Sequence, residues 1–199
     1  SDDDDADEEA DATGPPKKRS AGSVVVEQRE AARVVAAHGE AEDALAGLVR
    51  GGRIVGLTKG QFSLLDLIRA ALGHTGPADV IVSTWTTGIR DAENAALLVE
   101  RGAIKSLRLM TDRSFPTRQP DYCRRVCELF GSDAIVATRT HAKFALIWNE
   151  RWSVVIRSSM NLNRNPRFEQ FDLDDSPDLL AFFRAFVDDV AGTHRHGVN

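Results

Sequence analysis

Short runs rich in β-branched residues alternate with amphipathic segments in the first half of the chain, and this alternation limits the fold more than any other feature. Strands are predicted at 53–57, 79–85 and 104–110, and helices at 62–72, 90–102 and 120–131. Repeated strand–helix units place parallel strands in one sheet through right-handed crossovers, with helices covering the sheet. The first half therefore predicts an α/β domain.

The second half of the chain changes character. Strands are predicted at 134–138, 143–149 and 152–158, and the last two are joined by a short turn that begins near Asn149. That turn makes an antiparallel hairpin, so the sheet becomes mixed. Helices are predicted for the alanine-rich stretch 24–49 and for 176–192. We expect an α/β fold whose mixed sheet is flanked by helices on both faces.

The first 22 residues, SDDDDADEEADATGPPKKRSAG, differ from the rest in composition. They carry eight acidic and three basic residues without apolar periodicity, which predicts a disordered acidic tail, and a role as an interaction tail is compatible with that. The rest of the chain has equal numbers of acidic and basic residues, so the net charge of −5 belongs to the tail. The net charge therefore neither favours nor excludes a polyanionic substrate. We expect one domain at 23–192 and a flexible C-terminus at 193–199.

Neither a stretch long enough to span a membrane nor a secretory signal is found in the sequence. Cys123 and Cys127 lie four residues apart on one face of a predicted helix, without obvious further metal ligands nearby. Reduced, buried thiols are therefore the expected state. We expect a cytoplasmic protein that uses no metal and no cofactor and does not bind a membrane.

The most informative polar residues lie in the segment RTHAKFALIWNERWSVVIRSSMNLNRNPRFEQFDL, residues 139–173. His141 and Lys143 are two residues apart and share one face of a strand, and Ser159 and Asn161 repeat that spacing after the next strand. Each pair alone is common, and the asparagine-rich segment also fits an ordinary turn. Both pairs in this order, followed by Glu169, favour a functional site.

These residue types fit the chemistry of a phosphodiester, whose equatorial oxygens gain negative charge during transfer. Lys143 supplies a point charge, and Ser159 and Asn161 supply neutral hydrogen-bond donors. A neutral His141 imidazole can attack phosphorus and form a covalent intermediate. Glu169 could hold the other ring nitrogen and fix the tautomer.

The pattern resembles the phospholipase D superfamily, whose signature is His-x-Lys, an Asp five residues after the lysine, and then Gly-Ser-x-Asn. Trp148 stands in the place of the Asp and Ser158 in the place of the Gly. The resemblance spans about 53–190 and implies a phospholipase D-like fold with a metal-independent, phosphohistidine mechanism. It also implies a homodimer, because a single motif lacks the second histidine that serves as general acid.

Cationic residues near the predicted site are candidates for substrate binding: Lys59, Arg113, Arg139, Arg157 and Arg164. Lys59 and Arg113 follow predicted parallel strands, where open α/β sheets bind ligands, and the three others flank the motif. They could contact a phosphate backbone or form surface ion pairs.

We expect a phosphodiesterase that acts on nucleic acid. A catalytically inactive module that binds phosphate or DNA with the same fold is the alternative, since Trp148 departs from the signature. Trp85 and Trp148 are expected in the core, with stacking on bases as a second interpretation.

Overall fold

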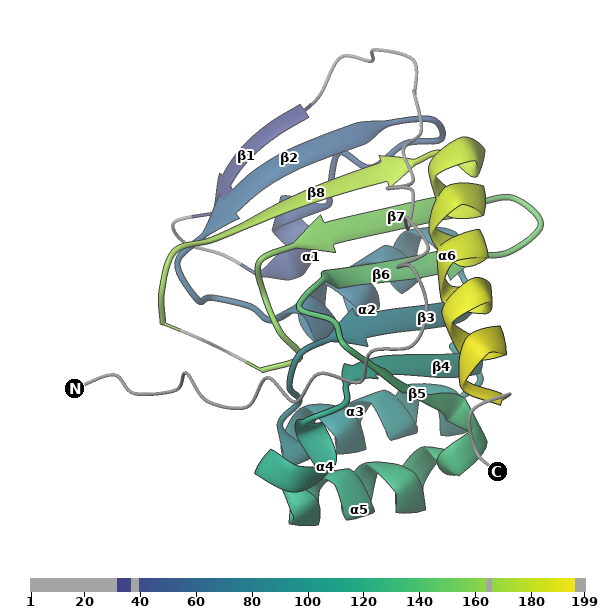
Figure 1. The fold of residues 1–199 in the computed structure, drawn as a ribbon. Coiled ribbons are helices and arrows are strands. Elements are labelled where there is room, and N and C mark those ends of the chain that lie inside the picture. Colours follow the sequence, from purple (N-terminus) through teal and green to yellow (C-terminus); the bar gives the residue numbers. More distant parts are fainter. Residues whose placement is uncertain (1–31, 37–39, 164–165, 196–199) are drawn as a thin grey trace, which may run out of the picture.

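The computed structural model describes residues 32–36, 40–163 and 166–195, with backbone only for 32–36 and 193–195. In this part of the chain eight strands form one sheet, in the order β1-β2-β8-β7-β6-β3-β4-β5 (Figure 1). The strands are β1 (Ala32–Ala36), β2 (Arg53–Thr58), β3 (Ala78–Thr84), β4 (Ile104–Asp112), β5 (Ile135–Thr138), β6 (Lys143–Trp148), β7 (Ser153–Ser158) and β8 (Glu169–Asp175). The helices are α1 (Ala41–Ala44), α2 (Leu64–Thr75), α3 (Ile89–Glu100), α4 (Phe115–Arg118), α5 (Pro120–Phe130) and α6 (Pro177–Arg195), with a 3-10 turn at Ser132–Ala134.

The sheet is mixed, as expected. Strands β3, β4 and β5 are parallel neighbours, and β1 pairs in parallel with β2. Between these two groups, β8, β7 and β6 pair with their neighbours in antiparallel fashion. The hairpin predicted from the second half is formed by β6 and β7.

Helices cover both faces of the sheet. Helices α1, α2, α3 and α5 pack on one face, where the larger core includes Leu67, Ile68, Val82 and Ile156. Helix α6 lies across the other face, over β5 to β7, and its Leu180 and Val187 pack on Phe144 and other sheet residues (Figure 1). No helix in the described part of the chain is long and apolar enough to cross a membrane.

Two predictions about secondary structure were wrong. The expected helix at 24–49 is replaced, within its described part, by strand β1 and the short helix α1, because the β-branched segment around Val34 extends the sheet beside β2. Strand β8 was not predicted, although Phe171 and Leu173 alternate with polar residues. Because β8 lies between β2 and β7, β2 is separated from the other parallel strands.

The expected boundaries of the domain were 23 and 192. Helix α6 continues to Arg195, so the first three residues of the expected flexible C-terminus are helical. The predicted acidic tail at 1–22 and the last residues, 196–199, lie outside the described residues.

Candidate active site

One edge of the sheet carries all the described residues of the predicted catalytic motif. The carboxyl ends of β2, β3, β4, β5 and β7 meet there with the amino ends of the antiparallel strands β6 and β8, on the left in Figure 1. His141 and Lys143 enter β6, Ser159 and Asn161 follow β7, and Glu169 begins β8. The fold therefore brings three separate segments to one place.

His141 lies on a loop that is fixed on both sides. The backbone amide of Thr140 donates to the Asp112 carboxylate at 3.1 Å, and the Ser83 hydroxyl donates to the carbonyl oxygen of Ala142 at 2.8 Å. The His141 side chain itself remains exposed to solvent. The loop thus presents an accessible imidazole from a backbone that is tied to β3 and β4.

Lys143 contacts the His141 ring directly. Its Nζ lies 3.0 Å from Nδ1, 3.3 Å from Nε2 and 3.0 Å from the His141 carbonyl oxygen. An ammonium group that donates to a ring nitrogen needs a lone pair there, so this contact fits a neutral imidazole. A neutral imidazole is the form that can act as a nucleophile.

Ser159 and Glu169 are hydrogen-bonded to each other across the β7–β8 pair. The Ser159 hydroxyl donates to the Glu169 carboxylate and accepts from the backbone amide of Gln170 at 3.0 Å. The Glu169 charge also acts on Lys143. These contacts bring Ser159, Glu169 and Lys143 into one polar cluster, while a bond from Glu169 to His141 stays a prediction.

Asn161 links the motif to the end of β3. Its Oδ1 accepts from the backbone amide of Trp85 at 3.2 Å and lies 3.3 Å from the Thr84 hydroxyl. Because a backbone N–H can only donate, this contact assigns the oxygen end of the amide. The Nδ2 group is then left for the donor role expected of Asn161.

Burial lowers the pKa of Lys143 below its ordinary value, and the nearby Glu169 charge opposes that shift only in part. A lysine with a lowered pKa loses its proton at a lower pH than an exposed lysine does. The cation that would hold a phosphate oxygen is therefore lost earlier on the alkaline side.

We expect phosphate binding and cleavage to decline as the pH rises. This alkaline limb of the pH profile should lie below pH 10.5, the ordinary pKa of lysine. In a Lys143→Arg chain this limb should move to higher pH, because a guanidinium stays protonated throughout that range. Lys105, exposed on β4, provides the control, since Lys105→Arg should leave the limb in place. An identical limb in the Lys143→Arg chain would show that another group titrates.

Asp112 organises the loop around His141, although it was not among the predicted site residues. Burial acts to raise its pKa, but hydrogen bonds from the Ser114 hydroxyl and from the amides of Ser114 and Thr140, with the Arg118 charge, hold that pKa below its usual value. Asp112 is therefore a stable anion that fixes two loops at once. The available signal was its position at the carboxyl end of a strand.

The predicted substrate-binding residues differ in their surroundings. Lys59, Arg113 and Arg139 are exposed at the same edge as His141, and within the described residues none of the three forms an ion pair. Arg157 instead projects from the α6 face of the sheet, where its Nη2 lies 2.6 Å from the Asp174 carboxylate. Arg164 lies outside the described residues.

No family model matches the sequence, and no curated protein matches it. The fold is similar to the crystal structure of polyphosphate kinase from Porphyromonas gingivalis, with a TM-score of 0.52 and 11% identity over 70% of this chain. This chain spans about a quarter of that protein, 26% of its length.

This likeness is one of fold alone. Within this fold, Trp148, which replaces the Asp of the signature, lies at the opposite end of β6 from Lys143, about 16 Å along the strand. Its ring is partly buried under α6, at the border of the core and not inside it, with the Arg184 guanidinium 4.6 Å away. The substitution at position 148 therefore lies outside the cluster around His141.

Asn149, the next residue, holds the β6–β7 turn. Its Oδ1 accepts from the amides of Arg151 and Trp152, at 2.9 and 3.0 Å. Its Nδ2 donates to the carbonyl oxygens of Thr75 and Pro77. These bonds fix the hairpin that carries Lys143 at its other end.

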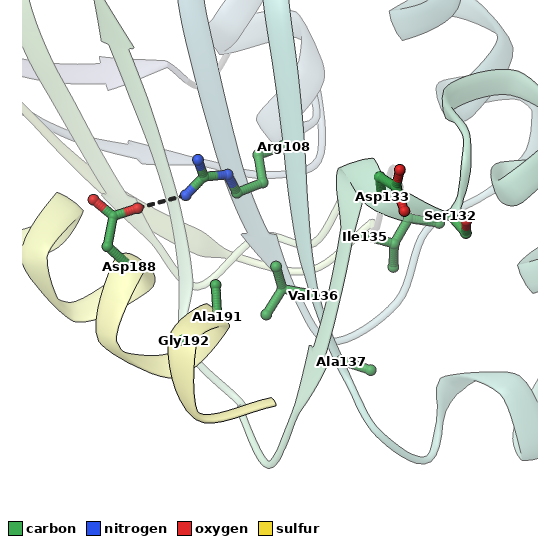
Figure 2. A pocket seen from close by; sticks show the side chains of 9 residues that line it. All are labelled: Arg108, Ser132, Asp133, Ile135, Val136, Ala137, Asp188, Ala191 and Gly192. Atoms are coloured by element: carbon green, nitrogen blue, oxygen red, sulfur yellow. Dashed lines mark hydrogen bonds and ion pairs between the residues drawn. The ribbon is translucent and has the colours of Figure 1, made fainter. Parts of the chain in front are cut away.

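A separate cavity of about 720 Å³ lies between the β4–β5 edge and the C-terminal half of α6 (Figure 2). The ion pair between Arg108 and Asp188, at 2.6 Å, crosses it. None of the predicted catalytic residues lines this cavity. This cavity is therefore separate from the cluster around His141.

Proposed function

We propose that the protein is a phosphodiesterase that cleaves nucleic acid through a phosphohistidine at His141, without a metal, as the family resemblance implies. The observation that carries the proposal is the contact of Lys143 with the His141 ring, beside the Ser159–Glu169 pair at the same edge. These groups come from three segments that the fold brings together. The phospholipase D-like fold supports phosphoryl-transfer chemistry in general.

In the first step, Lys143 and Asn161 hold the nonbridging oxygens of the phosphate, and the Ser159 hydroxyl joins them by turning its proton from the Glu169 carboxylate to the phosphate. A lone pair of the His141 ring attacks phosphorus, the P–N bond forms and the bond to the leaving oxygen breaks. A general acid gives a proton to that oxygen. In the second step water attacks phosphorus and gives a proton to the group that acted as the acid, the P–N bond breaks and the neutral imidazole returns.

The general acid in this proposal is His141 of a second copy of the chain. The exposed position of the His141 side chain leaves room for a second site to face it. A twofold axis through the site would bring the two imidazoles together, one as nucleophile and the other as acid. Cleavage by a chain that light scattering shows to be monomeric would contradict this arrangement.

Exposed cations at the sheet edge that carries His141 favour nucleic acid as the substrate. Most arginines elsewhere in the described sheet and helices are paired with carboxylates, as Arg53, Arg108 and Arg125 are. Lys59, Arg113 and Arg139 have no such partner among the described residues, and exposed cations of this kind attract a phosphate backbone.

The test is hydrolysis of bis(p-nitrophenyl) phosphate and of single- and double-stranded DNA, with excess EDTA present throughout. We expect cleavage that resists EDTA, and an acid-labile phosphoprotein when a slow substrate is mixed rapidly with the protein and trapped. Cleavage abolished by EDTA would sink the metal-independent mechanism. DNA binding with no cleavage under any condition would favour the inactive binding module.

A further inference from the structure

Arg118 is fixed in an unusual way close to the site. Its guanidinium carbon lies 3.8 Å from the centroid of the Trp85 ring. Its Nε donates to the Ser114 hydroxyl at 2.8 Å, and its Nη2 donates to the Trp85 carbonyl oxygen at 3.2 Å. The side chain is nevertheless exposed. A long arginine on a four-residue helix, α4, is thereby held in one orientation.

The same contacts tie Arg118 to His141. The Trp85 ring centroid lies 5.6 Å from that of the His141 ring, so one indole contacts both side chains. Asp112 gives a second connection, because its carboxylate accepts from Ser114, which holds Arg118, and from Thr140, which precedes His141. Arg118 and the candidate nucleophile therefore belong to one rigid unit.

The guanidinium of Arg118 keeps N–H donors that form no hydrogen bond within the described part of the chain. Among the described residues, hydrogen bonds use its Nε and Nη2, and none uses Nη1. A guanidinium that is planar, always charged and preorganised loses little rotamer freedom when it binds a phosphate. The nearby Asp112 carboxylate is already engaged by three donors from Ser114 and Thr140, so it orients Arg118 without closing it off.

We infer that Arg118 binds a second phosphate of the substrate, next to the one attacked by His141. This inference rests on the proposed function and names its substrate more closely: a nucleic acid strand with a phosphate flanking the scissile one. Diesters with a single phosphate would lack this contact. Trp85 then supports both groups, stacked under Arg118 and beside the His141 ring.

Binding of a labelled oligothymidylate measures this contact without turnover, in a chain that carries His141→Ala. Adding Arg118→Gln should weaken binding about tenfold at low salt and reduce the slope of log K against log salt concentration by about 0.7, one phosphate contact on a single strand. Arg151→Gln is the matched control: this exposed arginine lies in the β6–β7 turn at the opposite edge, and we expect no change of slope. Arg118→Lys should restore part of the affinity, because it keeps the charge without the fixed fork.

Kinetics with His141 intact provide the second readout. Arg118→Gln should lower kcat/KM about tenfold more for a dinucleotide that carries a flanking phosphate than for bis(p-nitrophenyl) phosphate, the difference expected for one charged contact. An unchanged salt slope, or equal losses on both substrates, would overturn the inference while cleavage itself still stood. An Arg118-dependent slope without any cleavage would support the phosphate contact and reject the proposed catalysis. Inorganic polyphosphate that binds through Arg118 while the oligonucleotide does not would overturn the assignment to nucleic acid.

Discussion

Replacing His141 with alanine should lower kcat/KM for nucleic acid cleavage by at least about 10³-fold, because no other group in the cluster can replace the nucleophile. The fold should be unaffected. His141 is exposed on a loop outside the strands, and the loop is held by backbone contacts of Thr140 and Ala142 that the substitution leaves in place. The free energy of unfolding should therefore change by no more than about 0.5 kcal/mol. Cleavage rates and urea unfolding curves of the two chains check both statements.

The matched control is His74→Ala. His74 is also exposed and lies in the last turn of α2, apart from the motif. It should keep full activity, so any effect of losing a histidine in general is separated from the loss of this one. If the His141→Ala chain kept more than about a tenth of the activity, far above the residual rate expected after loss of a nucleophile, another residue would have to be the nucleophile.

The same variant tests the shared site. When native chains are incubated with an excess of His141→Ala chains, mixed dimers form, and each contains one histidine where the proposed mechanism needs two. Activity per native chain should then fall as the excess grows. Activity per native chain that stayed constant would mean that each chain works alone, and the general acid would have to come from the same chain.

The sequence predicted the strands and the motif of the site because both depend on short-range patterns. A hydrophobic run follows His141 and Lys143 in β6, and another precedes Ser159 and Asn161 in β7. Both polar pairs could therefore be assigned to strand ends. Strand β8 was missed because five of its seven residues are charged or amide residues, although Phe171 and Leu173 keep the two-residue period of a half-buried strand. Its position between β2 and β7 is a long-range pairing that no local pattern contains.

The surroundings of the motif were also hidden from the sequence. The contacts of Asp112 with Thr140 and of Trp85 with Arg118 join residues about thirty positions apart, and only the fold brings them together. Arg157 shows the converse: a residue next to the motif in the sequence can lie away from it in the fold. It lies one residue before the Ser158–Ser159 pair, yet the alternation of a strand turns its side chain to the α6 face, where it pairs with Asp174.

The largest effect on stability is expected at Phe171, where β2 and β8 touch. Phe171 is only 1% exposed, pairs with Gly56 in the register, and meets the Phe62 ring edge-on at 5.8 Å between centroids. Phe171→Ala should lower the free energy of unfolding by about 3–5 kcal/mol, because it removes a large buried ring and leaves a cavity. The urea midpoint measures the loss. Leu57→Ala is the control on the same region of the sheet, since Leu57 is 48% exposed on the opposite face and should cost little.

Gly56 is required by that ring. A Cβ at position 56 would overlap the Phe171 ring, so Gly56→Ala should cost about 1–3 kcal/mol by overpacking. The two substitutions should not be additive: with Phe171→Ala in place, the new methyl group enters the vacated space, and the Gly56→Ala cost should largely disappear. Costs that simply added would mean that residue 56 is limited by something other than the ring.

Because Glu169 lies two residues before Phe171 on the same face of β8, the Phe171→Ala chain should also bind phosphate more weakly, which links this contact to the site.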